Sequence, residues 1–107
     1  MRTFEEYQSV ATRTPLSLRN NRDRINLPVL GLQEEAAKVG SLLASAVASG
    51  KLALTQEQTS ELKNRLSDIL WYVALLCGET GIAMQDVAAH SLAQLQARTK
   101  PLDPDQR

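Results

Sequence analysis

Residues 55–77 read TQEQTSELKNRLSDILWYVALLC, the most strongly patterned segment of this 107-residue chain. Thr55 and Gln58 fit a capping box, in which a threonine hydroxyl and a glutamine side chain satisfy backbone groups at a helix start. Apolar residues then recur three and four positions apart, which is the spacing of one helix face. They are Leu62, Leu66, Ile69, Leu70, Val73, Leu76 and Cys77. The pattern predicts a helix that ends before Gly81.

A short helix is predicted near the start of the chain. It begins at a second capping box, Thr3–Glu6, and ends before Pro15, because the residue before a proline avoids helical geometry. Its buried face is expected to comprise Phe4, Tyr7 and Val10 or Ala11. The polar residues 15–26 are predicted to form a surface connection.

Two more helices complete the prediction. One runs from about Pro28, which is tolerated in a first helical turn, to Gly50, a residue type that favours helix ends. Its apolar positions are Leu32, Ala36, Val39, Leu42, Leu43, Ala46 and Val47. The last helix spans about Met84–Arg98, and its inner side is expected to carry Val87, Ala88, Ser91, Leu92 and Leu95.

The expected fold class is all-α, because no segment alternates polar and apolar residues long enough to form a strand. Residues 1–100 are predicted to form one antiparallel four-helix domain, and the proline-containing residues 101–107 a flexible tail. The two long helices would each measure about 35 Å, more than one small bundle needs. Since a single copy would leave part of their wide apolar stripes in water, we expect a homodimer or homotetramer that completes the bundle.

Composition excludes several functional classes. Twelve Lys and Arg balance twelve Asp and Glu, so no positive excess directs the chain to nucleic acid. One cysteine and one histidine exclude a disulfide framework and a Cys/His metal site, leaving carboxylates as ligands for a hard cation. No apolar run is long enough to span a bilayer, and no signal-peptide core is present. A cytoplasmic protein without a membrane or nucleic-acid partner is expected.

Charged residues on the two long helices are the candidates for chemistry. Glu34 with Lys38, and Glu61 with Arg65, are ordinary i,i+4 pairs worth about 0.3–0.5 kcal/mol each on a solvated helix face. Asp68 differs because it stands among apolar residues, where an unpaired carboxylate is costly to desolvate. From the residues alone, both surface ion pairs and a functional site remain open.

Two segments match the order and spacing of the two acidic motifs of a known family. They are Gly31-Leu32-Gln33-Glu34-Glu35 and Asp68-Ile69-Leu70-Trp71-Tyr72-Val73. The chain resembles the MazG-like all-α nucleoside triphosphate pyrophosphohydrolases, which carry E-E-x-x-E on one helix and E-x-x-D on the next. Gly81-Ile82 and residues 92–98 (LAQLQAR) extend the resemblance, which covers roughly residues 3–98. It implies that Mg²⁺ held by carboxylates helps to cleave a nucleoside or deoxynucleoside triphosphate to monophosphate and pyrophosphate.

The chain departs from the family pattern at two acidic positions. Lys38 stands where the third glutamate of the first motif belongs, and Arg65 where the glutamate of E-x-x-D belongs. Three carboxylates and two cations leave a charge of about −1, and cations ~4–6 Å from a Mg²⁺ position repel that ion by several kcal/mol. We therefore expect Lys38 and Arg65 to replace the metal by bridging Glu35 and Asp68.

The resemblance implies a role for each matching residue. Glu35 and Asp68 would be catalytic, and the Mg²⁺ ligands, if the ion binds, would be Glu34, Glu35 and Asp68. The residues implied to contact the nucleotide are Lys38, Arg65, Arg98 and Trp71, although core packing also accounts for Trp71. Three possibilities remain open: a pyrophosphohydrolase with an altered metal site, a non-catalytic nucleotide-binding or protein-interaction module, or a structural helical bundle whose family likeness reflects ancestry alone.

Overall fold

The computed structural model describes residues 3–13, 21–50 and 53–99, and these residues form four α-helices and no strand. The helices are α1 (Phe4–Arg13), α2 (Asn21–Ala48), α3 (Gln56–Thr80) and α4 (Met84–Thr99). The predicted all-α class is confirmed. The predicted tail at 101–107 and the helix-ending Pro15 lie outside the described residues.

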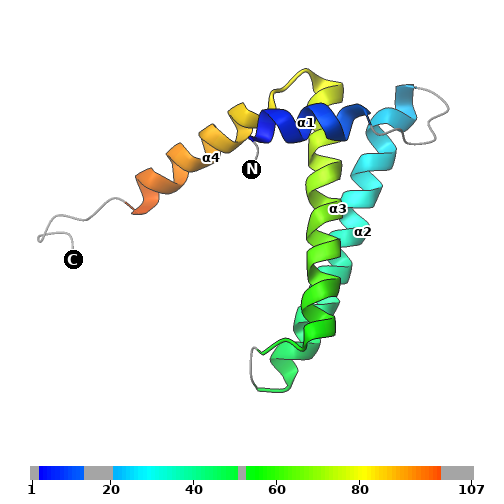
Figure 1. The fold of residues 1–107 in the computed structure, drawn as a ribbon, viewed down its shortest axis with the longest axis vertical. Helices are drawn as coiled ribbons and strands as arrows, with labels where there is room; N and C mark the ends of the chain where they lie inside the picture. Colours follow the sequence, from blue (N-terminus) through cyan, green and yellow to red (C-terminus); the bar gives the residue numbers. More distant parts are fainter. Residues whose placement is uncertain (1–2, 14–20, 51–52, 100–107) are drawn as a thin grey trace, which may run out of the picture.

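The two long helices α2 and α3 lie side by side and antiparallel (Figure 1). α1 crosses α3 near the end of the pair where α3 terminates, whereas α4 projects away from the pair. In one chain, α2 and α3 therefore form a helical hairpin, and α1 crosses it. α4 extends away from the hairpin and does not complete a four-helix bundle.

The predicted boundaries of α3 are confirmed. Thr55 Oγ1 accepts a hydrogen bond from Gln58 N at 3.1 Å, and Gln58 Oε1 accepts one from Thr55 N at 2.9 Å, completing the capping box. At the other end, Gly81 adopts φ 74°, a left-handed conformation that favours glycine. Ile82 N then donates to Cys77 O at 2.9 Å, which satisfies a terminal carbonyl.

The predicted start of α2 is wrong. The helix begins at Asn21 rather than near Pro28, so residues 21–26 are helical and not a surface connection. Pro28 removes only one N–H from the helical ladder, and its ring is fully buried, which offsets part of that loss. Arg24, on the first turns of α2, lies 3.7 Å from Glu79 at the end of α3.

The buried core lies where α1, α3 and α4 meet, and we call it the apolar junction. Its buried residues are Ala11, Ala74, Cys77 and Met84, with Tyr7, Trp71 and Val73 packed against them. Of the alternatives for α1, Ala11 is buried and Val10 is 57% exposed, while Phe4 is also exposed, contrary to the prediction. Because these core residues are mostly small, the helices approach closely; a Cβ at Gly78 would lie 2.8 Å from the Thr12 methyl.

Much of the predicted inner side of α4 is exposed in a single copy. Leu92 and Leu95 are 56% and 50% exposed, and Val87 is also exposed, while Met84 alone is buried. α2 similarly buries Ala46 but leaves Ala36 and Val47 exposed. No single described helix is long and apolar enough to cross a membrane; α3 and α4 meet that length and composition test only as a pair bent by 111°.

Candidate functional site

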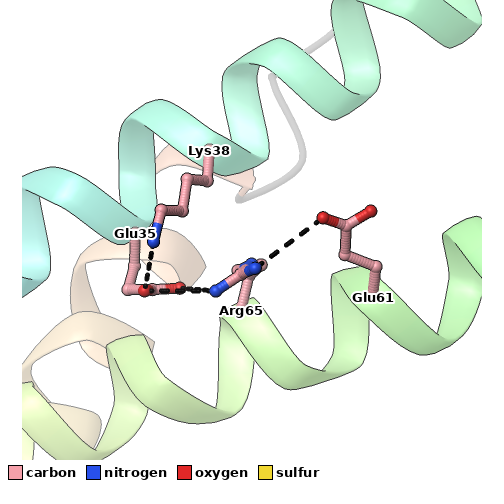
Figure 2. Close-up of polar contacts among 4 residues, drawn as sticks. All are labelled: Glu35, Lys38, Glu61 and Arg65. Atoms are coloured by element: carbon pink, nitrogen blue, oxygen red, sulfur yellow. Dashed lines mark hydrogen bonds and ion pairs between the residues drawn. The ribbon is translucent and has the colours of Figure 1, made fainter.

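Four charged residues meet between α2 and α3, and we call them the Glu35 cluster: Glu35, Lys38, Glu61 and Arg65 (Figure 2). Glu35 is only 6% exposed, the one charged residue buried in the described chain. Arg65 Nη1 lies 3.4 Å from Glu35 Oε1 and 3.3 Å from Oε2, so it joins α3 to α2. Lys38 Nζ reaches Glu35 Oε1 at 3.5 Å from one turn along α2.

The charges of the Glu35 cluster attract one another, but the hydrogen bonds between them are long. Charge-assisted N–H···O hydrogen bonds of high strength measure about 2.7–2.9 Å, shorter than those that Glu35 receives here. Arg65 Nη2 lies farther still, 3.8 Å from Glu61 Oε1. Arg65 Nε is buried and has no hydrogen-bond acceptor among the described residues, an arrangement that costs free energy. The contacts of the Glu35 cluster therefore do not satisfy the guanidinium completely.

The predicted bridge by Lys38 and Arg65 forms to Glu35 but not to Asp68. Both cations contact the Glu35 carboxylate, yet Asp68 takes part in no ion pair in the described part of the chain. The physical reason is that Glu35 is the more deeply buried carboxylate and has the greater need of counter-charge. For the same reason Lys38 pairs with Glu35 rather than with Glu34.

Asp68 instead lies close to two tyrosines. Burial raises the pKa of the Tyr7 hydroxyl, and the Asp68 carboxylate raises it further. Burial also raises the pKa of Tyr72, with added contributions from Asp68, Glu35 and Glu34. All three carboxylates that match the family motifs thus lie within electrostatic range of the Tyr72 hydroxyl, which stays protonated and able to donate a hydrogen bond.

Gly31 is a position whose role the sequence did not reveal. A Cβ built there would lie 2.5 Å from the Tyr72 ring, so the ring packs directly on the α2 backbone. Glycine inside a helix lowers helix stability by about 1 kcal/mol relative to alanine. This cost was the feature of the sequence from which a close contact at Gly31 could have been predicted. Gly31 and Tyr72 together set the spacing of the two helices beside the acidic residues.

The acidic residues do not fit a Mg²⁺ site in this arrangement. Mg²⁺ requires nearly octahedral oxygen ligands at about 2.0–2.1 Å. Both Glu35 oxygens face cationic nitrogens instead. Within residues 3–13, 21–50 and 53–99, no group of three or more Asp, Glu, His or Cys is placed to hold a metal ion. Glu35 could join a metal site only after Lys38 and Arg65 moved away from its oxygens.

Trp71 and Arg98 lie apart from the Glu35 cluster. Trp71 Nε1 donates to Ala11 O at 3.2 Å, and its ring stacks on Tyr72 with centroids 5.5 Å apart. These contacts confirm the packing role expected for Trp71, and its contact with a nucleotide stays a prediction. Arg98 is exposed in the last turn of α4, which Figure 1 shows directed away from α2 and α3.

Two open grooves flank the Glu35 cluster. The larger has a volume of about 810 Å³ and includes Arg65 and Glu61 in its lining. The smaller, of about 400 Å³, is lined partly by Lys38 and Glu61. Hydroxyl and amide groups of Ser60 and Asn64 line the larger groove. Small-molecule sites commonly measure about 300–1,000 Å³, so either groove is large enough for part of a nucleotide.

Comparison with known proteins gives one significant similarity. The chain is 29% identical over 69 residues to the Gene 37 protein of Mycobacterium phage L5. The match covers 64% of this chain and 60% of that protein's length. No protein-family model and no solved structure matches the chain. At this identity and coverage, the similarity assigns neither a family nor an activity.

Proposed function

We propose that this chain is a MazG-like nucleotide pyrophosphohydrolase with an altered site, which binds nucleoside triphosphates through side-chain cations in place of resident Mg²⁺. The observation that carries the proposal is the engagement of both oxygens of buried Glu35 by Lys38 and Arg65. Such an arrangement neutralises the carboxylate as a divalent ion otherwise would. It supplies no metal-activated water, so we expect hydrolysis to be weak or lost.

Phosphate binding at this position follows from the chemistry of the two cations. Arginine offers a planar fork that matches phosphate oxygens, and lysine offers a mobile point charge. The contacts to Glu35 are long, so a phosphate that entered a groove would share the Lys38 and Arg65 cations with the Glu35 carboxylate. The grooves beside Lys38 and Arg65 would accept the rest of the ligand.

A second candidate function is a metal-dependent pyrophosphohydrolase. The observation in its favour is that Asp68, Glu35 and Glu34 all add to the rise that burial causes in the pKa of Tyr72. If Lys38 and Arg65 rotated toward the grooves, these carboxylates would be the ligands available to Mg²⁺. Their chemistry would then match what the family resemblance implies.

Calorimetry and a pyrophosphate-release assay separate the candidates. We expect the wild-type chain to bind a nucleoside triphosphate without Mg²⁺ and to release little or no pyrophosphate. Lys38→Glu combined with Arg65→Glu should lose this binding and gain affinity for Mg²⁺. A matched control, Arg13→Glu with Lys63→Glu, makes the same charge change on exposed residues outside the cluster and should behave as wild type.

Two outcomes would contradict the proposal. Mg²⁺-dependent release of pyrophosphate by the wild-type chain would establish the second candidate. Absence of nucleotide binding with and without Mg²⁺ would exclude both candidates, leaving the protein-interaction module or the structural bundle.

A further inference from the structure

Glu61 is the member of the Glu35 cluster to which the proposed function gives no role. It lies near the start of α3, and its carboxylate points toward Arg65, one turn farther along the same helix (Figure 2). Arg65 lines the larger groove and Lys38 lines the smaller one. Among the described residues that line them, the two grooves share Glu61. Its side chain therefore borders the approach to both cations.

The charges of the Glu35 cluster cancel while Glu61 keeps its place. Glu35 and Glu61 each carry one negative charge, and Lys38 and Arg65 each carry one positive charge. Without the Glu61 charge, the remaining three residues would carry a net charge of +1. Since opposite charges attract over several ångströms, the cluster would attract an anion more strongly without Glu61 than with it.

The two carboxylates of the cluster differ in how easily they can give up a cation. The side chain of Glu35 is 8% exposed, so separating it from Arg65 would leave a buried charge without compensation, which strongly destabilises a protein. The side chain of Glu61 is 51% exposed, and its contact with Arg65 measures 3.8 Å. Exposed ion pairs contribute little to stability, because water solvates the separated charges. An incoming anion would therefore replace Glu61 and leave Glu35 in place.

We infer that Glu61 is an autoinhibitory carboxylate, which occupies one side of the Arg65 guanidinium until a phosphate oxygen of the ligand replaces it. Glu61 thereby lowers the affinity of the site for every phosphate ligand. This inference rests on the proposed function, because it concerns the same two cations. It adds to that proposal the residue that a phosphate must displace.

A polyphosphate is the ligand class that fits this exchange. Lys38 Nζ and Arg65 Nη1 both contact Glu35 Oε1, at 3.5 and 3.4 Å, so the two cations lie close together. A ligand with several phosphate oxygens can contact both cations at once, which one carboxylate of Glu61 does not do here. Inorganic tripolyphosphate supplies these oxygens without a base or a sugar and is therefore the simplest probe.

The test measures the affinity of the full chain for inorganic tripolyphosphate by isothermal titration calorimetry in the absence of Mg²⁺. Glu61→Gln removes the charge but keeps the size of the side chain. We expect this variant to bind tripolyphosphate about tenfold more tightly than the wild-type chain. Its stability toward urea should equal that of the wild-type chain, because the lost ion pair is exposed.

Glu57→Gln is the matched control. Glu57 lies one turn before Glu61 on α3, is exposed and lines the same larger groove. Among the described residues, the ion pairs of Arg65 are to Glu35 and Glu61 and not to Glu57. The control removes the same charge from the same groove, so its affinity should stay within about twofold of wild type.

A second variant tests whether the gain in affinity depends on Arg65. Arg65→Gln added to Glu61→Gln should remove the gain, because the cation that Glu61 uncovers is then absent. Urea denaturation checks that each variant is folded. Should the double variant fail to fold, the comparison of Glu61→Gln with Glu57→Gln still decides the inference.

The possible results separate this inference from the proposed function. Equal affinities of the wild-type chain and Glu61→Gln would overturn the inference and leave the proposed function standing. An equal gain for Glu57→Gln would also overturn it, since loss of any nearby negative charge would then suffice. Binding by Glu61→Gln but not by the wild-type chain would support the inference and contradict the proposed function. Absence of binding by both chains would contradict both.

Discussion

The apolar junction and the Glu35 cluster both hold α3 against another helix, but they do so with different chemistry. The junction combines small buried residues with hydrogen bonds such as the one from Trp71 Nε1 to Ala11 O. The cluster combines a buried carboxylate with two cations at long distances and one unpaired donor. The junction therefore depends on packing, whereas the cluster depends on compensation of a buried charge.

The difference bears on where the proposed function would place a ligand. Replacing a buried ion pair by apolar residues is often neutral or stabilising, so a buried ion pair is weak evidence of a stabilising role. The grooves lie beside the cluster, and the apolar junction borders a separate depression lined by residues such as Gln8 and Thr12. Under the proposed function, a ligand would bind in the region between α2 and α3, while the junction holds α1, α3 and α4 together.

The largest expected change in the free energy of unfolding comes from removing one partner of the buried Glu35 carboxylate. Arg65→Leu leaves buried Glu35 with Lys38 as its remaining cation and should lower the free energy of unfolding by about 3 kcal/mol. Urea denaturation measures the change. Glu35→Leu combined with Arg65→Leu should recover most of it, because no uncompensated charge then remains. A loss equal to that of the single variant would show that packing, and not charge, governs this region.

A smaller effect is expected at the edge of the junction. Gln8 Nε2 donates to Ile82 O at 3.0 Å, and Met84 N donates to Gln8 Oε1 at 2.8 Å, so Gln8 ties α1 to the start of α4. Gln8→Ala should lower the free energy of unfolding by about 2 kcal/mol. It should also speed hydrogen exchange at the Met84 amide. Gln94→Ala, on the exposed part of α4, is the control and should change neither quantity.

The tyrosines between the two regions predict a pH dependence. Because the pKa values of Tyr7 and Tyr72 are raised in the folded state, the unfolded chain loses their protons first as pH increases. Stability should therefore fall as pH rises from the ordinary tyrosine pKa of about 10 through the raised values. Denaturation at several alkaline pH values measures the slope. Tyr7→Phe with Tyr72→Phe should flatten it; an unchanged slope would assign the effect to other groups.

The smallest effect is expected for Lys38. Its side chain is 48% exposed and its contact with Glu35 lies within one helix. Lys38→Met should therefore change the free energy of unfolding by about 0.5 kcal/mol or less. Urea denaturation in parallel with Arg65→Leu makes the comparison. A loss as large as that of Arg65→Leu would mean that Lys38, and not the arginine, compensates the buried charge.

Part of the fold followed from local sequence signals. The capping box at Thr55 and the glycine at position 81 predicted both ends of α3. The start of α2 could not be predicted the same way, since residues 21–26 are polar and Pro28 favours a first helical turn. The additional N-terminal turns of α2 contact another helix, as Arg24 does with Glu79 of α3.

The candidate site was predictable to a similar extent. Motif spacing placed Glu35, Lys38 and Arg65 together, and the structure does bring them into contact. Sequence spacing did not show that Asp68 would lie near Tyr7 and Tyr72 instead of pairing with a cation. The family resemblance implies that Arg98 contacts the nucleotide, and the structure places this residue in the last turn of α4, a helix directed away from α2 and α3.

The local sequence determined helix type, helix period and capping, because each of them depends on residues no more than four positions apart. Which cation neutralises Glu35, and which apolar faces stay uncovered, depended on how α1, α2, α3 and α4 meet in space. Coulombic attraction and burial act between residues that the chain separates by 30 positions or more, as for Glu35 and Arg65. No local pattern encodes that distance.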